Sequence, residues 1–183
     1  AHGIFNGVQT LRQLFPADIE NTTVVSGVEW AAPYCDIYDK PEYSYRGAMI
    51  DSARHFFSVE SVKRQVDHMA KYKINKLHLR LADDQGWRLE IKGETETGES
   101  YDKLRTIGAS TSCSTNGYRP GQYTQEEFRE LAEYAADHYV EIIPEFDMPG
   151  HSWAALVSLE YLNSTEDGTP AIMTIQSRMT DGM

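Results

Sequence analysis

The sequence predicts a parallel α/β fold, and in particular a partial (β/α)8 TIM barrel. Short apolar runs alternate with amphipathic segments along residues 44–183, which is typical of right-handed βαβ crossovers. Polar side chains follow each run directly, where barrels and doubly wound sheets place their sites. The run at 77–82 has one polar face, which favours a barrel, because an open parallel strand is usually apolar on both faces.

The first predicted strand and helix lie at 45–74. Residues 45–51 form a short apolar run closed by an acid, which indicates a strand. Ser58 is a suitable N-cap for the helix that follows, whose apolar side chains recur at helical spacing: Val62, Val66, Met69 and Ala70. We expect this helix to run to about Ile74.

Two more strands and one more helix are predicted downstream. Leucines alternate with other residues along 77–82, the period of a strand. Residues 92–122 are rich in Gly, Ser and Thr and are interpreted as an excursion loop. Thr124 and Glu127 have the spacing of a capping box, and Phe128, Leu131 and Ala135 continue the buried stripe of a helix. Residues 140–146 form the third strand.

Residues 1–43 are interpreted as the end of a preceding small α/β domain. Apolar positions 4, 8, 11 and 14 form the stripe of a helix that Pro16 ends, and 22–30 is a β-prone run. Residues 44–183 are too few for a barrel of about 250 residues, so we expect only its first three βα units. The missing initiator Met and the abrupt end lead us to expect a piece of a longer protein.

The composition is that of a globular chain with a strong acidic excess. The 183 residues carry 17 Lys and Arg against 28 Asp and Glu, a formal net charge of −11, and the cations do not cluster. This argues against nucleic acid or an anionic membrane as a partner. Neither an apolar run of about 18 residues nor a signal peptide is recognisable.

The two cysteines, Cys35 and Cys113, lack the spacing of a thiolate zinc site, and whether they pair is open. The sequons at Asn21 and Asn163 are glycosylation acceptors if the chain passes through a eukaryotic secretory route. Nucleotide-binding, dinucleotide-binding and zincin motifs do not occur. We interpret three histidines as structural or surface residues and two methionines as core residues: His55, His68 and His138, then Met49 and Met69.

The strand ends carry the candidate site residues. Arginine, carboxylates and histidine suit a polyhydroxylated, uncharged ligand, and Trp87 is able to stack on a pyranose ring. Simpler interpretations stay open for each. Arg54 could have the purely structural role of pairing with Asp51 to cap the sheet. Asp83-Asp84 could be a turn or N-cap, and His151 could be a turn histidine.

Three blocks, in order, resemble glycoside hydrolase family 20, the β-N-acetylhexosaminidases, and especially its chitobiase-like members. They are Asp51-Ser52-Ala53-Arg54-His55-Phe56, the run from Leu77 to Arg88 that contains Asp83-Asp84-Gln85-Gly86-Trp87, and Pro144-Glu145-Phe146-Asp147-Met148-Pro149-Gly150-His151. The long loop at 92–122 and the start at 3–14 are also similar to this family, so the resemblance covers nearly the whole chain.

The resemblance implies a (β/α)8 barrel that removes terminal β-linked N-acetylglucosamine or N-acetylgalactosamine with retention. The substrate's own acetamido oxygen is the implied nucleophile, an Asp orients that group, and a neighbouring Glu is the general acid. No metal or organic cofactor is implied. The implied partner is an N-acetylhexosamine-containing oligosaccharide or glycoconjugate, and the implied setting is secreted, periplasmic or lysosomal; a homodimer is possible.

By position, Arg54 resembles the arginine that holds sugar hydroxyls. Asp83 and His151 resemble the pair that supports the catalytic Glu. Asp147 resembles the acid that ends the strand in the same block as His151. Two departures are evident. The family usually has His-x-His on its second strand, where this chain has Arg80 at the second position, and the catalytic Asp-Glu pair does not occur within residues 1–183.

The departures leave two main hypotheses and a third that fits less well. The chain is either part of a working hexosaminidase whose Asp-Glu pair follows in the same frame, and is inactive alone, or a non-catalytic sugar-binding remnant. A divalent-metal hydrolase that uses Asp83, Asp147 and His151 as ligands fits the residue types but not the motif order.

Overall fold

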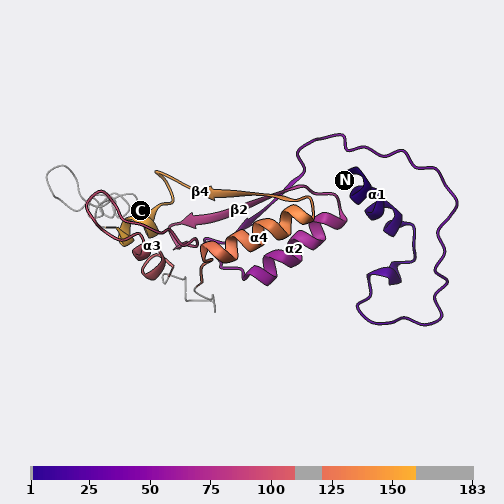
Figure 1. Cartoon of the computed structure of the whole chain (residues 1–183), viewed down its shortest axis with the longest axis horizontal. Coiled ribbons are helices and arrows are strands. Elements are labelled where there is room, and N and C mark those ends of the chain that lie inside the picture. Colours follow the sequence, from indigo (N-terminus) through magenta and orange to yellow (C-terminus); the bar gives the residue numbers. More distant parts are fainter. Residues whose placement is uncertain (1, 110–120, 160–183) are drawn as a thin grey trace, which may run out of the picture.

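The computed structural model describes residues 2–109 and 121–159, and its centre is a small, mainly parallel sheet (Figure 1). Strand β2 (Lys76–Asp83) is flanked by β1 (Gly47–Asp51) on one side and by β4 (Glu141–Phe146) on the other, both parallel to it. The short β3 (Gly86–Trp87) turns back antiparallel to the end of β2. The alternation of strands and helices predicted from the sequence is therefore confirmed as an α/β fold.

Two helices cover the same face of this sheet and lie side by side (Figure 1). Helix α2 (Val59–Lys71) begins at Ser58, whose hydroxyl accepts from the backbone N–H of Ser61, and α4 (Gln125–Asp137) begins with the predicted Thr124–Glu127 capping box. Helix α2 ends earlier than the predicted Ile74, because Lys73 adopts a left-handed conformation with φ of 59°.

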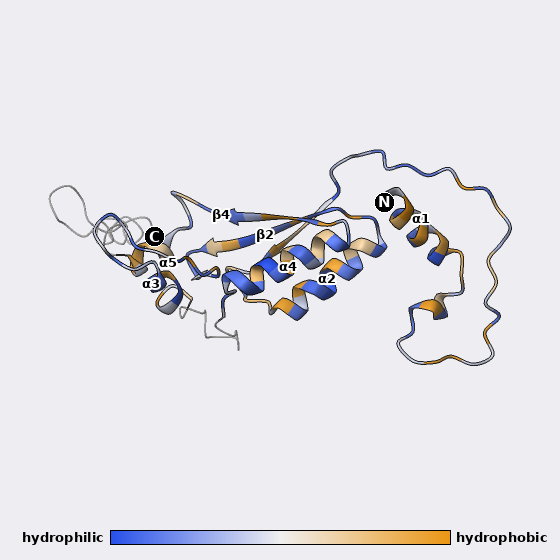
Figure 2. Cartoon of the chain, viewed as in Figure 1, coloured by the Kyte–Doolittle hydropathy of each residue, from blue (hydrophilic) through white to orange (hydrophobic). Residues whose placement is uncertain are grey.

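The main core lies between the helices and the sheet. The leucines of β2 are fully buried beneath apolar side chains of both helices, as the alternating pattern predicts; the cluster includes Val62, Val66, Met69, Leu77, Leu79, Leu81, Leu131 and Ala135. Figure 2 shows both helices striped with apolar and polar residues. Met69 is buried as predicted, but Met49 is 51% exposed, so its assignment to the core was wrong. Ala48 and Ile50 of β1 pack on the core, and Met49, between them, points to the opposite face.

The N-terminal part contains helix α1 (His2–Gln13) and a 3-10 turn, η1 (Ala17–Glu20), as the apolar stripe and Pro16 predict. The β-prone run 22–30 does not form a strand: the chain from 21 to 46 is extended without regular structure, and Val24 is fully exposed. A strand needs a neighbouring strand to accept its backbone hydrogen bonds, and none lies beside this segment in the described residues. The division into a domain at 1–43 and another at 44–183 stays a prediction.

The region predicted as one long loop contains a short helix, α3 (Asp102–Thr106). Its Leu104 packs with Ala155 and Leu159 at α5 (Trp153–Ser158), which forms a second apolar cluster that also includes Trp87. Within the described ranges no helix is long and apolar enough to cross a membrane. Cys35 is exposed and free, and Cys113 and Asn163 lie outside the described residues.

Candidate active site

The carboxyl ends of the parallel strands bring a row of charged side chains to the open face of the sheet. The register aligns Asp51 of β1 with Arg80 of β2, and Arg80 with Glu145 of β4. Because the leucines of β2 face the helices, the residues between them face the other way. Polar side chains from three separate segments therefore meet at one edge, as the sequence predicts.

Arg54, in the turn after β1, contacts two of these carboxylates. Its Nη1 lies 3.0 Å from Asp51 Oδ2 and its Nη2 lies 3.0 Å from Asp83 Oδ2. The simple pairing with Asp51 is therefore present, but it is one of two contacts. The Arg54 side chain keeps 42% of its surface exposed, so it can still meet a ligand that approaches this end of the sheet.

Asp83, at the end of β2, has a fully buried carboxylate that contacts Arg54, Arg80 and His151; these four residues are called the cluster below. Its Oδ1 accepts a hydrogen bond of 2.6 Å from the backbone N–H of Asp84. Its Oδ2 lies 2.7 Å from Arg80 Nη2 in addition to the Arg54 contact, although neither approach has hydrogen-bond geometry. Two cations thus compensate a charge that would otherwise be costly to bury.

His151 reaches the same carboxylate from the segment after β4. Its Nδ1 lies 3.4 Å from Asp83 Oδ1 and 3.5 Å from Asp84 Oδ2, and its backbone has a φ of 53°. Asp84 also accepts a 3.1 Å hydrogen bond from the backbone N–H of Trp153, the first residue of α5. Both the turn and the helix-start interpretations therefore describe real contacts, but they do not account for the meeting of His151 with Asp83.

The chain's relationship to known proteins agrees with this geometry. The family model described as "Glycosyl hydrolase family 20, catalytic domain" matches residues 43–182. The chain belongs to glycoside hydrolase family 20.

Relatives in this family are similar over most of the chain. A β-hexosaminidase of Porphyromonas gingivalis is 42% identical over 162 residues, which is 88% of this chain and 20% of that protein. Two solved structures, a GH20 β-N-acetylhexosaminidase of Streptomyces coelicolor and an N-acetyl-β-hexosaminidase of Streptomyces plicatus in complex with Thio-NAglucal, are 46% and 44% identical, with TM-scores of 0.78 and 0.77. Each match covers 92% of this chain and 32% or 31% of the other. The chain thus spans a fifth to a third of the relatives' length.

A second group of charges at this edge of the sheet is centred on Arg80. Its Nη2 donates a 2.8 Å hydrogen bond to Asp147 Oδ2, and its Nη1 lies 2.9 Å from Glu145 Oε1. Burial lowers the pKa of Arg80, but the facing carboxylates of Asp83, Glu145 and Asp147 outweigh it and raise that pKa above its usual value. Asp147, a predicted site residue, therefore contacts the cluster through Arg80.

Sequence reasoning missed the participation of Arg80, Glu145 and His78 in this group of charges. His78 forms an ion pair with Glu145 when protonated. The signal that could have found them is the alternation along 77–82, which places His78 and Arg80 on the same open face. Their partner Glu145 follows from the register between β2 and β4, which a sequence alone does not supply.

Trp87 is partly buried in the second apolar cluster. Its indole N–H donates a 2.7 Å hydrogen bond to the carbonyl of Leu89, and its ring lies 5.2 Å from that of Phe146. These contacts hold the ring near the end of β2. A role in stacking on a sugar stays a prediction.

Metal-ligating atoms also come together here. Asp83, Asp84 and His151 each offer an atom within 4.8 Å of the others. The group differs from the one considered from the sequence, because Asp84 takes the place of Asp147. Arg54 and Arg80 lie against Asp83, and two guanidinium groups oppose the binding of a further cation. This arrangement suits ion pairing better than metal binding.

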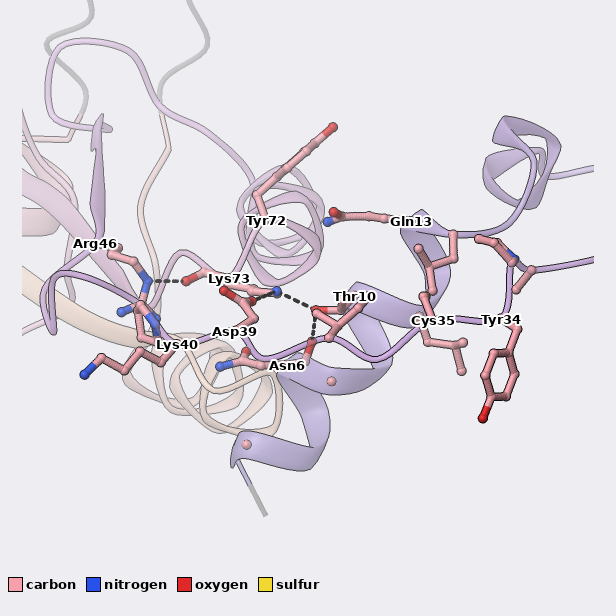
Figure 3. Close-up of a pocket in the computed structure, with 18 residues that line it drawn as sticks. Asn6, Thr10, Gln13, Tyr34, Cys35, Asp39, Lys40, Arg46, Tyr72 and Lys73 are labelled. Carbon is pink, nitrogen blue, oxygen red and sulfur yellow. Dashed lines mark hydrogen bonds and ion pairs between the residues drawn. The ribbon is translucent and has the colours of Figure 1, made fainter.

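A cavity of about 810 Å³ lies elsewhere (Figure 3). It is lined by residues of α1, of the segment 32–41, and by Arg46 and Lys73, which precede β1 and β2. Lys73 donates hydrogen bonds to Thr10 and Asp39 across it. It thus opens at the amino ends of the strands, the end opposite Arg54 and Asp83, and none of the five predicted site residues lines it.

Proposed function

We propose that the protein carrying this chain is a retaining β-N-acetylhexosaminidase. It hydrolyses terminal β-linked N-acetylglucosamine or N-acetylgalactosamine from oligosaccharides or glycoconjugates. The observation that carries the proposal is the buried carboxylate of Asp83, held between Arg54 and His151 at the carboxyl ends of parallel strands in a family-20 chain. Solved structures of a mutant Streptomyces plicatus β-hexosaminidase with GlcNAc and of a Vibrio harveyi relative with N-acetylglucosamine support this substrate class.

The proposed roles follow from exposure and charge. Arg54, which is partly exposed, donates to hydroxyls of the terminal sugar. The substrate's acetamido oxygen attacks the anomeric carbon, and a Glu outside residues 1–183 protonates the departing oxygen. Asp83 and His151 form the charged link that orients this Glu, and Asp147 supports the link through Arg80. This mechanism requires no metal.

The fold proposed for the catalytic part is the beginning of a (β/α)8 barrel. Its support is the neighbour order β1, β2, β4, which follows the chain, together with the two helices on one face. In a doubly wound sheet, helices would cover both faces. The polar face of β2 would then point into the barrel, towards its mouth.

The test is an assay of the complete protein on 4-nitrophenyl N-acetyl-β-D-glucosaminide. The matched control is 4-nitrophenyl β-D-glucopyranoside, which lacks the acetamido group that acts as nucleophile in the proposed mechanism. We expect release of nitrophenol from the first substrate only, with the β-anomer as the first product in the proton NMR spectrum. Equal turnover of both substrates, or an α-anomer product, would overturn the proposal.

A non-catalytic sugar-binding protein is the second candidate. The specific observation in its favour is that Arg54 is partly exposed and held by Asp51 and Asp83, an arrangement that can bind sugar hydroxyls without turnover. Binding of N-acetylglucosamine to the complete protein, measured by calorimetry and without turnover of the substrate, would support it.

We also propose a secreted, periplasmic or lysosomal location, which cell fractionation tests. We further propose a homodimer, which light scattering distinguishes from a monomer.

A further inference from the structure

Three carboxylates at the carboxyl ends of β2 and β4 contact one guanidinium group, that of Arg80. Arg80 lies at 2.7 Å from Asp83, 2.8 Å from Asp147 and 2.9 Å from Glu145. The Arg80 side chain is only 11% exposed, and Asp83 is completely buried. Charges this far from water are screened weakly, so their balance matters more than at an exposed surface.

The contacts of Arg80 join elements that are distant in the chain. Asp83 ends β2, Glu145 lies on β4, and Asp147 follows β4. The register between β2 and β4 shifts between Arg80 and Ala82, so the strands are irregularly paired beside this cluster. The guanidinium group therefore ties Asp83 to β4 where the backbone ladder is interrupted.

Other ionisable groups surround the cluster, and carboxylates outnumber the arginines among them. Those that face Arg80 or contact its partners are Asp51 and Arg54 near β1, His78 and Asp84 near β2, and His151 after β4. Arg54 and Arg80 are the two arginines in contact with Asp83.

We propose that Arg80 is a positioning residue of the site: its permanent charge holds Asp83 against Glu145 and Asp147. An arginine does not lose its proton in the working range of a protein, whereas an imidazole does. Arg80 therefore keeps its charge and its contacts with the three carboxylates between about pH 5.5 and 8.5. The catalytic part of this inference rests on the proposed hexosaminidase activity.

The test replaces the permanent cation with a titrating one in the complete protein. For Arg80→His, we expect kcat relative to the wild type to fall on the order of tenfold more at pH 8.5 than at pH 5.5, with a smaller change in KM, because Arg54 rather than Arg80 is proposed to hold the sugar. Arg80→Lys remains charged across this range, so its ratio to the wild type should not vary with pH. Arg64→His, an exposed site on α2, is the matched control and should have a constant ratio near one.

Thermal unfolding without substrate separates this inference from the proposed function. Carboxylates raise the pKa of a histidine in the folded state, so its stabilising effect is present at low pH and is lost as pH rises through the raised value. The Tm of Arg80→His should therefore fall relative to the wild type between pH 5.5 and 8.5. If the wild type is inactive, the proposed function fails and this Tm series still decides the charge role of Arg80. A pH-independent difference in Tm and in kcat, or an equal decline in Arg80→Lys, would overturn the inference.

Discussion

Arg54 Nη2 and the buried Oδ2 of Asp83 lie 3.0 Å apart, although one residue follows β1 and the other ends β2. The Arg54 side chain is partly exposed, and its two terminal nitrogens contact the carboxylates of Asp51 and Asp83. A ligand bound by Arg54 would thus be fixed relative to Asp83. This pair links the proposed sugar contact to the proposed support of the acid.

Replacement of Arg54 should mainly weaken substrate binding. In the complete protein, Arg54→Ala removes a forked donor to sugar hydroxyls, so we expect KM to rise by about tenfold or more. Steady-state kinetics on the N-acetylglucosaminide measures this, with Arg64→Ala on α2 as the exposed control. An Arg54→Ala variant with the wild-type kcat/KM would show that Arg54 does not hold the sugar.

Replacement of His151 should affect turnover more than binding. His151→Ala removes a group that contacts Asp83 Oδ1, and the link to the general acid would lose its orientation. We expect a lower kcat, by about 10- to 100-fold, and a displaced acid limb of the pH–rate profile. The measurement is kcat between pH 4 and 8; a profile with unchanged shape would contradict this coupling.

Removal of divalent metals should leave the activity unchanged. The two arginines beside Asp83 oppose a cation at the Asp83, Asp84 and His151 group. Full activity after dialysis against excess chelator is the expected result. Activity that is lost and then restored by a divalent ion would favour a metal hydrolase instead.

Arg88 should be a major contributor to stability. It is completely buried, and its guanidinium group donates to five backbone carbonyls, those of Ser52, Ala53, Gln85, Ala109 and Gly121. Arg88→Met would leave these acceptors unsatisfied, so we expect the free energy of unfolding to fall by about 3 kcal/mol or more. Urea unfolding measures this, and Arg64→Met on the exposed face of α2 should change stability by less than about 0.5 kcal/mol. Similar small changes in both variants would refute this role.

Tyr123 should make stability sensitive to alkali. Burial raises the pKa of Tyr123 to about 12, and its hydroxyl is bonded to Ser52 and to the carbonyl of Phe57. Since the folded state binds this proton more tightly than the unfolded chain, the contribution is complete below about pH 10 and declines as pH rises towards 12. Urea unfolding at pH 8, 10 and 11 should show a steeper decline for the wild type than for Tyr123→Phe. Parallel declines would contradict the assignment.

Patterns within one segment were predicted well because their causes are local. Ser58 and Thr124 begin their helices because a side-chain oxygen bonds a backbone N–H three residues ahead. The buried leucines of β2 follow from alternation alone. The prediction of a β-prone run at 22–30 did not yield a strand, because β propensity does not provide a partner strand. The prediction that Met49 lies in the core was wrong, because an apolar residue on a strand can face away from the helices.

The sequence by itself determined the α/β pattern, the motifs of family 20, and the placing of Arg54, Asp83, Asp147 and His151 at strand ends. Tertiary structure alone decided which of their atoms meet. The role proposed for Arg80 depends on the register between β2 and β4, and the carbonyls around Arg88 come from separate turns. Such contacts depend on how strands and loops are placed in space, which local spacing does not specify, because the packing of the whole core sets them.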